Sequence, residues 1–201
     1  MGITPSEVVE RLKGILLPSA IISEPVLQET NPEGSHDSIA IRHADDALFV
    51  SFEQWFRQHK CFGNPCNNIG DLADWLYPLF RRIAGLKSSS DYLCFVAREN
   101  VLWVVMFELK NNHTDAARRQ IASTSRLAEY LIAVALRDVK EIDWPLVEYR
   151  EVVVNELARA MKSTGAFRLR YERDSVKKNL GYATLKRRKR YPLELFLSNI
   201  G

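Results

Sequence analysis

Residues 88–113, SSSDYLCFVARENVLWVVMFELKNNH, contain two apolar runs that lie almost back to back in this 201-residue chain. Seven of the eight residues from Val101 to Glu108 are apolar, and both runs are rich in β-branched and aromatic side chains. Such runs are typical of β-strands, and the Glu99-Asn100 pair between them predicts a tight hairpin. Because Val101 to Leu109 is apolar at both alternating positions, we expect this strand at the centre of a sheet, covered on both faces.

The second strand ends on two charged residues, Glu108 and Lys110, where its apolar pattern stops. In an antiparallel pair the numbers of facing residues have a constant sum. A two-residue turn gives a sum of 199 and places Asp91 opposite Glu108. A sum of 201 places Asp91 opposite Lys110, whereas a sum of 200 moves Asp91 to the other face. Two of these three registers bring all three residues to one face at the open end of the hairpin.

Two carboxylates a few ångströms apart repel each other, and one of them protonates unless a cation lies between them. A hard divalent ion, Mg²⁺ or Mn²⁺, suits the oxygen ligands that Asp91 and Glu108 offer on a rigid strand pair. Such an ion activates water and neutralises charge on a phosphate oxygen, and Lys110 would position the water or stabilise the transition state. The alternative is that Glu108 and Lys110 only mark a strand leaving the core, with a surface ion pair to Asp91.

Asp91 on one strand, followed by Glu108-Leu109-Lys110 at the end of the next, resembles the PD-(D/E)xK nuclease superfamily. Many members carry a Gln about ten residues further on, in the following helix, and Gln120 stands at that place. The resemblance covers roughly residues 71–137. It implies a restriction-endonuclease-like α/β sandwich, with a short mixed central sheet flanked by helices, in a single domain spanning residues 1–201.

By the same resemblance, the catalytic residues are Asp91, Glu108, Lys110 and Gln120, and the metal ligands are Asp91 and Glu108. Many members add a further carboxylate from an earlier helix, for which Asp74 and Glu53 are the candidates. Ser90 stands where the superfamily often has a proline. The implied activity is that of a Mg²⁺- or Mn²⁺-dependent endonuclease acting on DNA in preference to RNA.

Periodicity predicts the other elements. Helices are expected at 5–16, 52–59, 71–87 and 113–138. Residues 39–52 fit either two short strands or the start of a helix, and 139–165 fit either a strand near 147–154 or a helix running to 161. A half-exposed strand is expected at 165–174. Two polar stretches, 24–38 and 60–70, predict loops.

The positive charge is concentrated at the end of the chain. The net charge of the whole chain is only +3, but residues 151–201 contain 12 Lys or Arg against 5 Asp or Glu. A basic C-terminal segment, about 165–201, predicts a polyanionic partner. The predicted nucleic-acid contacts are Arg118 and Arg119 before Gln120, and Lys186, Arg187, Arg188, Lys189 and Arg190. The apolar residues after this tract are expected to pack on the domain or on a partner.

Three alternatives accompany the nuclease interpretation. The domain could be a catalytically inactive nuclease-like module that binds nucleic acid or a partner protein. A zinc site is conceivable at His59, Cys61, Cys66 and His113, but the spacing fits no standard finger. The chain could also form a homodimer. Three cysteines and no secretory leader predict an intracellular, cytoplasmic protein, nuclear if the source is eukaryotic, and no apolar run predicts a membrane helix.

Overall fold

A computed structural model describes residues 2–28, 38–42, 46–51, 60–61, 64–65, 90–110, 114–155, 169, 171–173, 180–186 and 190–198. The helical elements are α1 (Pro5–Ile15), α4 (Thr114–Ala135) and three short 3₁₀ segments, η1 (Pro18–Ala20), η2 (Glu141–Asp143) and η3 (Leu193–Phe196). The strands are β1 (Ile21–Ile22), β2 (Val26–Gln28), β3 (Ser38–Arg42), β4 (Ala47–Val50), β5 (Lys60–Cys61), β6 (Asn64–Pro65), β7 (Tyr92–Arg98), β8 (Val101–Lys110), β9 (Leu146–Asn155), β10 (Glu172–Arg173), β11 (Leu180–Lys186) and β12 (Arg190–Pro192).

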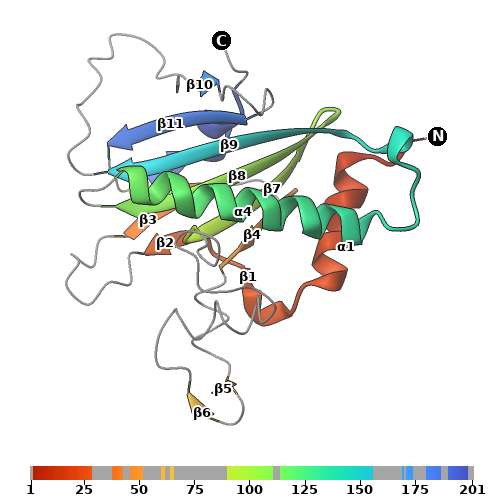
Figure 1. Cartoon of the computed structure of the whole chain (residues 1–201), viewed down its shortest axis with the longest axis horizontal. Coiled ribbons are helices and arrows are strands. Elements are labelled where there is room, and N and C mark those ends of the chain that lie inside the picture. The colour runs from red at the N-terminus through yellow and green to blue at the C-terminus, as the bar shows by residue number, and fades with distance from the viewer. Residues whose placement is uncertain are drawn as a thin grey trace.

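These elements form an α/β fold around a mixed seven-stranded sheet with the order β1-β4-β7-β8-β9-β11-β10. β8 lies in the middle of this sheet, antiparallel to β7 and parallel to β9, and β9 is parallel to β11. The long helix α4 connects β8 to β9 and runs across one face of the sheet, with α1 beside it (Figure 1). Two parallel neighbouring strands need such a crossover connection, because the end of the first strand lies far from the start of the second.

The β7–β8 hairpin has the register that a two-residue turn predicts. Arg98 pairs with Val101, and the ladder continues to Tyr92 opposite Phe107, so facing numbers sum to 199. Glu99, the first residue of the turn, has a positive φ of 54°. Turns with a positive φ at this position match the right-handed twist of the flanking strands. The prediction of a tight hairpin at residues 99 and 100, with an odd register sum, is therefore confirmed.

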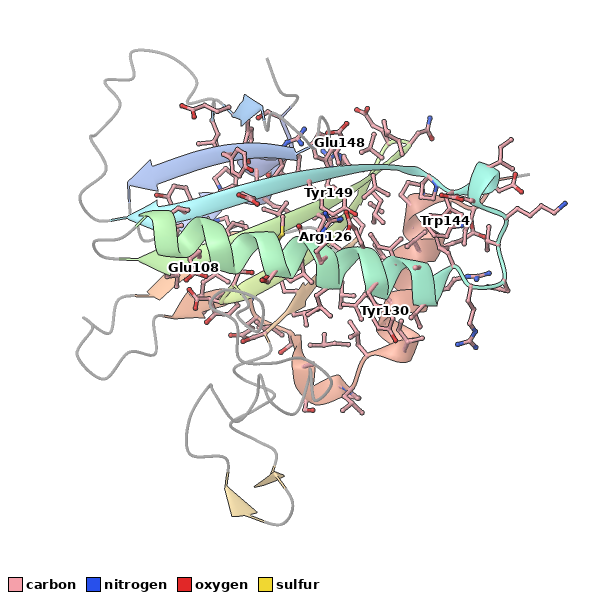
Figure 2. The ribbon with its side chains drawn as sticks, viewed as in Figure 1. Glu108, Arg126, Tyr130, Trp144, Glu148 and Tyr149 are labelled. Carbon is pink, nitrogen blue, oxygen red and sulfur yellow. The ribbon has the colours of Figure 1, made fainter. Side chains whose placement is uncertain are left out.

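The central strand is buried on both faces, as its uninterrupted apolar run predicts. Leu102, Val104 and Met106 of β8 pack with α1 and α4 in one core cluster. Its odd-numbered residues from Trp103 to Leu109 pack in a second cluster on the opposite face. Tyr149 of β9 belongs to the helical side and lies under α4 (Figure 2). The alternation places every even-numbered residue of β8 on the side covered by helices.

The N-terminal helix α1 begins and ends close to the predicted bounds. Its N-cap is Thr4, whose hydroxyl accepts a hydrogen bond from the Glu7 N–H at 3.3 Å, while the Glu7 carboxylate accepts from the Thr4 N–H at 2.8 Å. The hydrogen bonds that the Glu7 carboxylate accepts from the N–H and from the hydroxyl of Thr4 lower the pKa of Glu7. This capping box satisfies N–H groups that a helix start leaves without intrahelical partners. The helix expected at 5–16 is confirmed, but its cap, Thr4, was not predicted from the sequence.

The face of the sheet opposite α4 is covered by a small three-stranded sheet with the order β12-β3-β2 and by η3. The expectation of a loop throughout residues 24–38 is wrong for Val26–Gln28, which pairs with β3 as β2. Strand pairing overrides the polar, Pro-bearing local pattern there. Leu193 and Phe196 of η3 are buried, so the apolar C-terminal residues pack on the domain as predicted.

Several other sequence predictions can be compared with the described residues. Residues 39–52 contain two strands, β3 and β4, and 146–155 form the strand β9, which settles both alternatives in favour of strands. Residues 60–70, expected as a loop, include the short pair β5 and β6. A strand was expected at 165–174. Within the described residues of this range, Glu172–Arg173 forms the short strand β10. The helices expected at 52–59 and 71–87 lie outside the described residues.

No described helix is long and apolar enough to cross a membrane.

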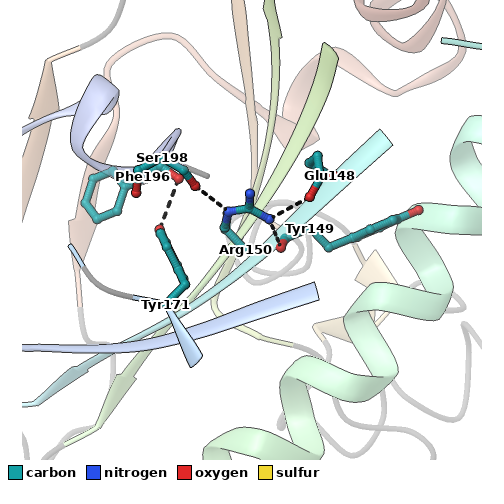
Figure 3. A network of polar contacts seen from close by, with 6 residues as sticks. All are labelled: Glu148, Tyr149, Arg150, Tyr171, Phe196 and Ser198. Carbon is teal, nitrogen blue, oxygen red and sulfur yellow. Dashed lines mark hydrogen bonds and ion pairs between the residues drawn. The ribbon is translucent and has the colours of Figure 1, made fainter. Parts of the chain in front are cut away.

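A fully buried arginine fixes the end of the chain to the sheet (Figure 3). Arg150 of β9 donates to the Ser198 carbonyl oxygen at 3.0 Å and to the Glu148 carboxylate at 3.0 Å. It also donates to the Tyr149 carbonyl oxygen and lies over the rings of Trp103 and Tyr171. Burial lowers the pKa of this guanidinium, while the hydrogen bond to Glu148 opposes the shift. The guanidinium of Arg150 thus offers several hydrogen-bond donors at a buried position and connects β9 with the segment after η3.

We expect Arg150→Met to lower the free energy of unfolding by about 2–4 kcal/mol, because two carbonyl oxygens lose their donor. Urea unfolding measures the change. The matched control is Arg126→Met, since Arg126 pairs with Glu129 on the surface and its side chain is 80% exposed. That variant should stay within about 0.5 kcal/mol of the parent. Equal losses in the two variants would contradict an anchoring role for Arg150.

Candidate functional site

Asp91 and Glu108 lie next to each other at the open end of the β7–β8 hairpin. The ladder ends at Tyr92 opposite Phe107, so one further step places Asp91 opposite Glu108. The Asp91 N–H donates to Glu108 Oε2 at 3.2 Å, and the Leu109 N–H donates to Asp91 Oδ2 at 2.7 Å. Each carboxylate therefore accepts a backbone hydrogen bond from the strand opposite to its own. Such bonds stabilise negative charge on both groups.

The two carboxylates differ in exposure. Glu108 is 0% exposed, whereas Asp91 is partly exposed at the start of its strand. The helix α4 covers this corner: the buried Thr124 hydroxyl accepts a hydrogen bond from the Ser90 N–H at 2.6 Å. Figure 2 places Glu108 beside the N-terminal half of α4, far from Trp144 at the other end of the sheet. The Thr124 contact holds the backbone just before Asp91 and so helps to position its carboxylate.

Lys110 and Gln120 take the positions that the sequence predicts for them. Lys110 is the last residue of β8, two residues after Glu108, so its place in the strand belongs to the same face. Gln120 lies in α4 one helical turn before Thr124. The side chains of Lys110 and Gln120 fall outside the described part of the structure. The backbone positions of Asp91, Glu108 and Lys110 are thus brought to one corner, with Gln120 in the helix above it.

The remaining predicted residues divide into two groups. Arg118 and Arg119 lie in α4 just before Gln120, Lys186 ends β11, and the exposed Arg190 begins β12. Outside the described residues lie Glu53, Asp74, Arg187, Arg188, Lys189 and three members of the zinc alternative, His59, Cys66 and His113. The predictions of a third carboxylate at Asp74 or Glu53 therefore stay predictions.

Three strand ends that are distant in sequence lie side by side at the edge where Glu108 is found. In the parallel pair β8–β9, Lys110 faces Asn155, and in the parallel pair β9–β11, Asn155 faces Lys186. The last residues of these three parallel strands are register partners, so the three C-terminal ends form one row. The sequence could not predict this row, because it depends on which strands become neighbours.

Glu151 is a buried acid that sequence analysis did not single out. It is 2% exposed, and it pairs with Met106 on the adjacent strand, on the face that carries Glu108. Its signal in the sequence was weak: one Glu next to a run of three valines. Among the described residues, no group of three or more His, Cys, Asp or Glu is placed to hold a metal ion. Asp91 and Glu108 are a pair of carboxylates that lie side by side in this part of the chain.

Comparisons of the chain with family models, with curated proteins and with solved structures found no match. The functional interpretation thus depends on the residues and their geometry.

We expect Thr124→Val to lower the free energy of unfolding by about 1–3 kcal/mol, because the buried Ser90 N–H would lose its acceptor while side-chain volume is kept. Thr124→Ser, which retains the hydroxyl, is the matched control and should lose less. Urea unfolding of the three proteins measures both effects. If the valine variant were as stable as the parent, the Ser90–Thr124 hydrogen bond would not hold this corner together.

Proposed function

We propose that this protein is a metal-dependent nuclease that hydrolyses phosphodiester bonds, with DNA as the preferred substrate. The observation that carries the proposal is the pairing of Asp91 with Glu108 at the end of an otherwise apolar strand, two residues before Lys110. A strand that only ran out into solvent would expose its terminal carboxylate, yet Glu108 is fully buried. Burying a carboxylate costs several kcal/mol unless charge or hydrogen bonds compensate it, so a role for the charge is favoured.

The arrangement of elements supports a restriction-endonuclease-like fold as part of this proposal. An antiparallel hairpin carries the two acids, a long helix follows, and the next strand joins parallel to the second strand of the hairpin. The sequence resemblance implies the order helix, meander, strand with Glu108 and Lys110, then helix; the described structure agrees for the hairpin and the helix after it, while the helix expected at 71–87 lies outside the described residues. This agreement extends the resemblance beyond the three-residue motif from Glu108 to Lys110, which is short enough to occur by chance.

The donor atoms fit a hard divalent cation such as Mg²⁺ or Mn²⁺. Asp91 and Glu108 supply carboxylate oxygens, the ligands that these ions prefer, and they come from neighbouring strands held by mutual hydrogen bonds. A carboxylate has two oxygens, so one can accept a backbone N–H while the other faces an ion. When bound, the ion would neutralise charge on the scissile phosphate and promote ionisation of water.

The protein's own residues then have separate tasks. Asp91 and Glu108 would hold the ion, whose positive charge would attract the phosphate. Lys110, at the end of β8, would orient the attacking water or stabilise the extra negative charge of the transition state. Gln120 in α4 would support the site or the water from the helix side. Water adds to phosphorus, the bond to the leaving sugar oxygen breaks, and a proton passes from the water to solvent while the leaving oxygen gains one.

A second candidate function is a nuclease-like module that binds nucleic acid or a partner protein without cutting. The observation that favours it is the use of both carboxylates as acceptors for backbone N–H groups, which gives them a structural role in the hairpin. In that case the acids complete the ladder at the strand end, and only the basic residues contact the ligand. The two functions differ in whether a divalent cation binds at Asp91 and Glu108.

Calorimetric titration with Mn²⁺ should show binding to the parent protein that weakens at least about tenfold, or about 1.4 kcal/mol, in Asp91→Asn and in Glu108→Gln. Both substitutions keep a side-chain oxygen for the backbone hydrogen bond but remove the charge that attracts the ion. Asp138→Asn is the matched control, because Asp138 pairs with Arg11 on the surface and its side chain is 65% exposed. Unchanged Mn²⁺ affinity in both site variants would exclude the metal site.

Cleavage of plasmid and single-stranded DNA should require Mg²⁺ or Mn²⁺ and fall at least about 100-fold in Asp91→Ala and in Lys110→Ala. Lys140→Ala, at an exposed lysine just before η2, should cleave like the parent. Gel-based rates measure all four proteins. Absence of metal-dependent cleavage, together with salt-sensitive DNA binding that survives Glu108→Gln, would identify the protein as the binding module instead.

A further inference from the structure

The strand β9 carries a buried acid, Glu151, that the proposed reaction does not use. Glu151 is 2% exposed and lies between Tyr149 and Val153, which both pack in the core cluster under α4. Side chains alternate along a strand, so Glu151 belongs to this helix-covered face. Its register partners are Met106 of β8 and Tyr182 of β11. An apolar side chain would fill this position at lower cost, because a buried carboxylate loses its hydration.

The register makes Glu151 a diagonal neighbour of Glu108. Glu108 pairs with Val153, and Glu151 lies two residues before Val153 on the same face. With strands about 4.8 Å apart and a rise of about 3.3 Å per residue, the Cα atoms of the two glutamates lie roughly 8 Å apart. Long side chains on such diagonal positions are within reach of each other. Asp91, one residue before β7, lies on the other side of Glu108, so three neighbouring segments contribute one acid each.

The helix α4 changes from apolar to polar as it approaches this corner. Its buried residues Ala128 and Ile132 belong to the apolar core cluster, whereas Thr124 and Ser125, one turn earlier, carry buried hydroxyls. The Thr124 hydroxyl binds the Ser90 N–H at the start of the hairpin. Hydroxyls and carboxylates that are buried together are the groups to which ordered water binds inside proteins. The corner is therefore built for polar groups.

One oxygen of each glutamate accepts no hydrogen bond from the protein. These atoms are Oε1 of Glu108 and Oε2 of Glu151, and both are buried. Both residues have other partners, and for Glu108 one of them is the Asp91 N–H. Buried acceptor atoms generally have a donor, and water bound to a cation is a strong one. Because no three acids of the described residues are placed to hold an ion directly, a water-mediated contact fits Glu151 better than direct ligation.

We propose that Glu151 is a third carboxylate of the cation site and that it binds a water molecule of the hydrated ion, not the ion itself. Mg²⁺ keeps several waters when one or two carboxylates hold it, so Asp91 and Glu108 as direct ligands leave such waters in place. A carboxylate behind them orients the waters and adds negative charge that favours the cation. Glu151 is thus a positioning residue. This inference rests on the proposed function, because Asp91 and Glu108 must hold the ion.

The first test is calorimetric titration with Mn²⁺. Glu151→Gln should bind Mn²⁺ about tenfold more weakly than the parent protein, the loss typical of an outer-shell partner. Glu151→Met, which suits the apolar neighbours, should lose at least as much and decides the question if the Gln variant does not fold. The matched control is Glu194→Gln, at an exposed residue of η3 on the opposite side of the sheet, and it should keep the parental affinity.

Two outcomes of this titration separate the two proposals. Parental affinity in both Glu151 variants, together with weakened binding in Asp91→Asn, would overturn this inference and leave the proposed function intact. A parent protein that binds no Mn²⁺ would overturn both.

The second test counts the water ligands of bound Mn²⁺ by pulsed electron paramagnetic resonance in isotopically labelled water. At saturating Mn²⁺, the parent protein and Glu151→Gln should show the same number, because Glu151 does not replace a water on the ion. One additional water in the variant would show direct ligation and overturn the outer-shell assignment.

The third test is urea unfolding with EDTA and with Mn²⁺. In EDTA, Glu151→Gln should be at least as stable as the parent protein, since it removes a buried charge beside a second acid. With Mn²⁺ the variant should gain less stability, because ligand binding stabilises the folded state in proportion to its affinity. A variant that is less stable in EDTA yet gains as much from Mn²⁺ as the parent would show that Glu151 only supports the fold, and the inference would fail.

Discussion

The candidate site depends on a single geometric constraint, the parity of the β7–β8 hairpin. Side chains alternate along a strand, so a change of one in the register sum would move Asp91 to the face opposite Glu108. The two-residue turn, with Glu99 at a φ of 54°, fixes the sum at 199. The backbone hydrogen bonds to Asp91 Oδ2 and Glu108 Oε2 then extend the pairing by one residue beyond the ladder. A turn of two residues therefore determines which acids meet about eight residues away.

The burial of Glu108 makes the corner energetically demanding. A buried carboxylate is tolerated only where hydrogen bonds or positive charge compensate for its lost hydration. Part of this compensation is the Asp91 N–H, but Asp91 itself adds a second negative charge to the same corner. An apolar residue at either position would avoid this cost. A cation between the two acids would turn their repulsion into attraction, which is the physical reason for proposing a metal site at this pair.

Elements with a strong local sequence pattern were predicted correctly. Elements that form only through contacts with distant parts of the chain were not. The hairpin and α4 have strong local patterns, and their places agree with the structure, whereas residues 139–165 fitted a strand or a helix equally well until the pairing of β9 decided for a strand. Val26–Gln28 looked like part of a loop because its strand character comes from pairing with β3. The buried Arg150 gave no sequence signal, because several of its partners are distant in the sequence: the Ser198 carbonyl oxygen and the rings of Trp103 and Tyr171. The pairing of Asp91 with Glu108 was predictable only because a short turn leaves few registers.

Sequence alone could not connect the basic tract to the candidate site, since 76 residues separate Lys110 from Lys186. The parallel pairing of β8 with β9 and of β9 with β11 removes this separation, because parallel strands in register bring their C-terminal ends to one edge. In open α/β sheets this edge is where ligands generally bind. The backbone positions of Glu108 and Lys186 thereby lie near the same edge of the sheet. A polyanion passing this edge would be repelled by the two acids unless a cation neutralised their charge, so the proposed cation site and the proposed polyanionic partner depend on each other physically.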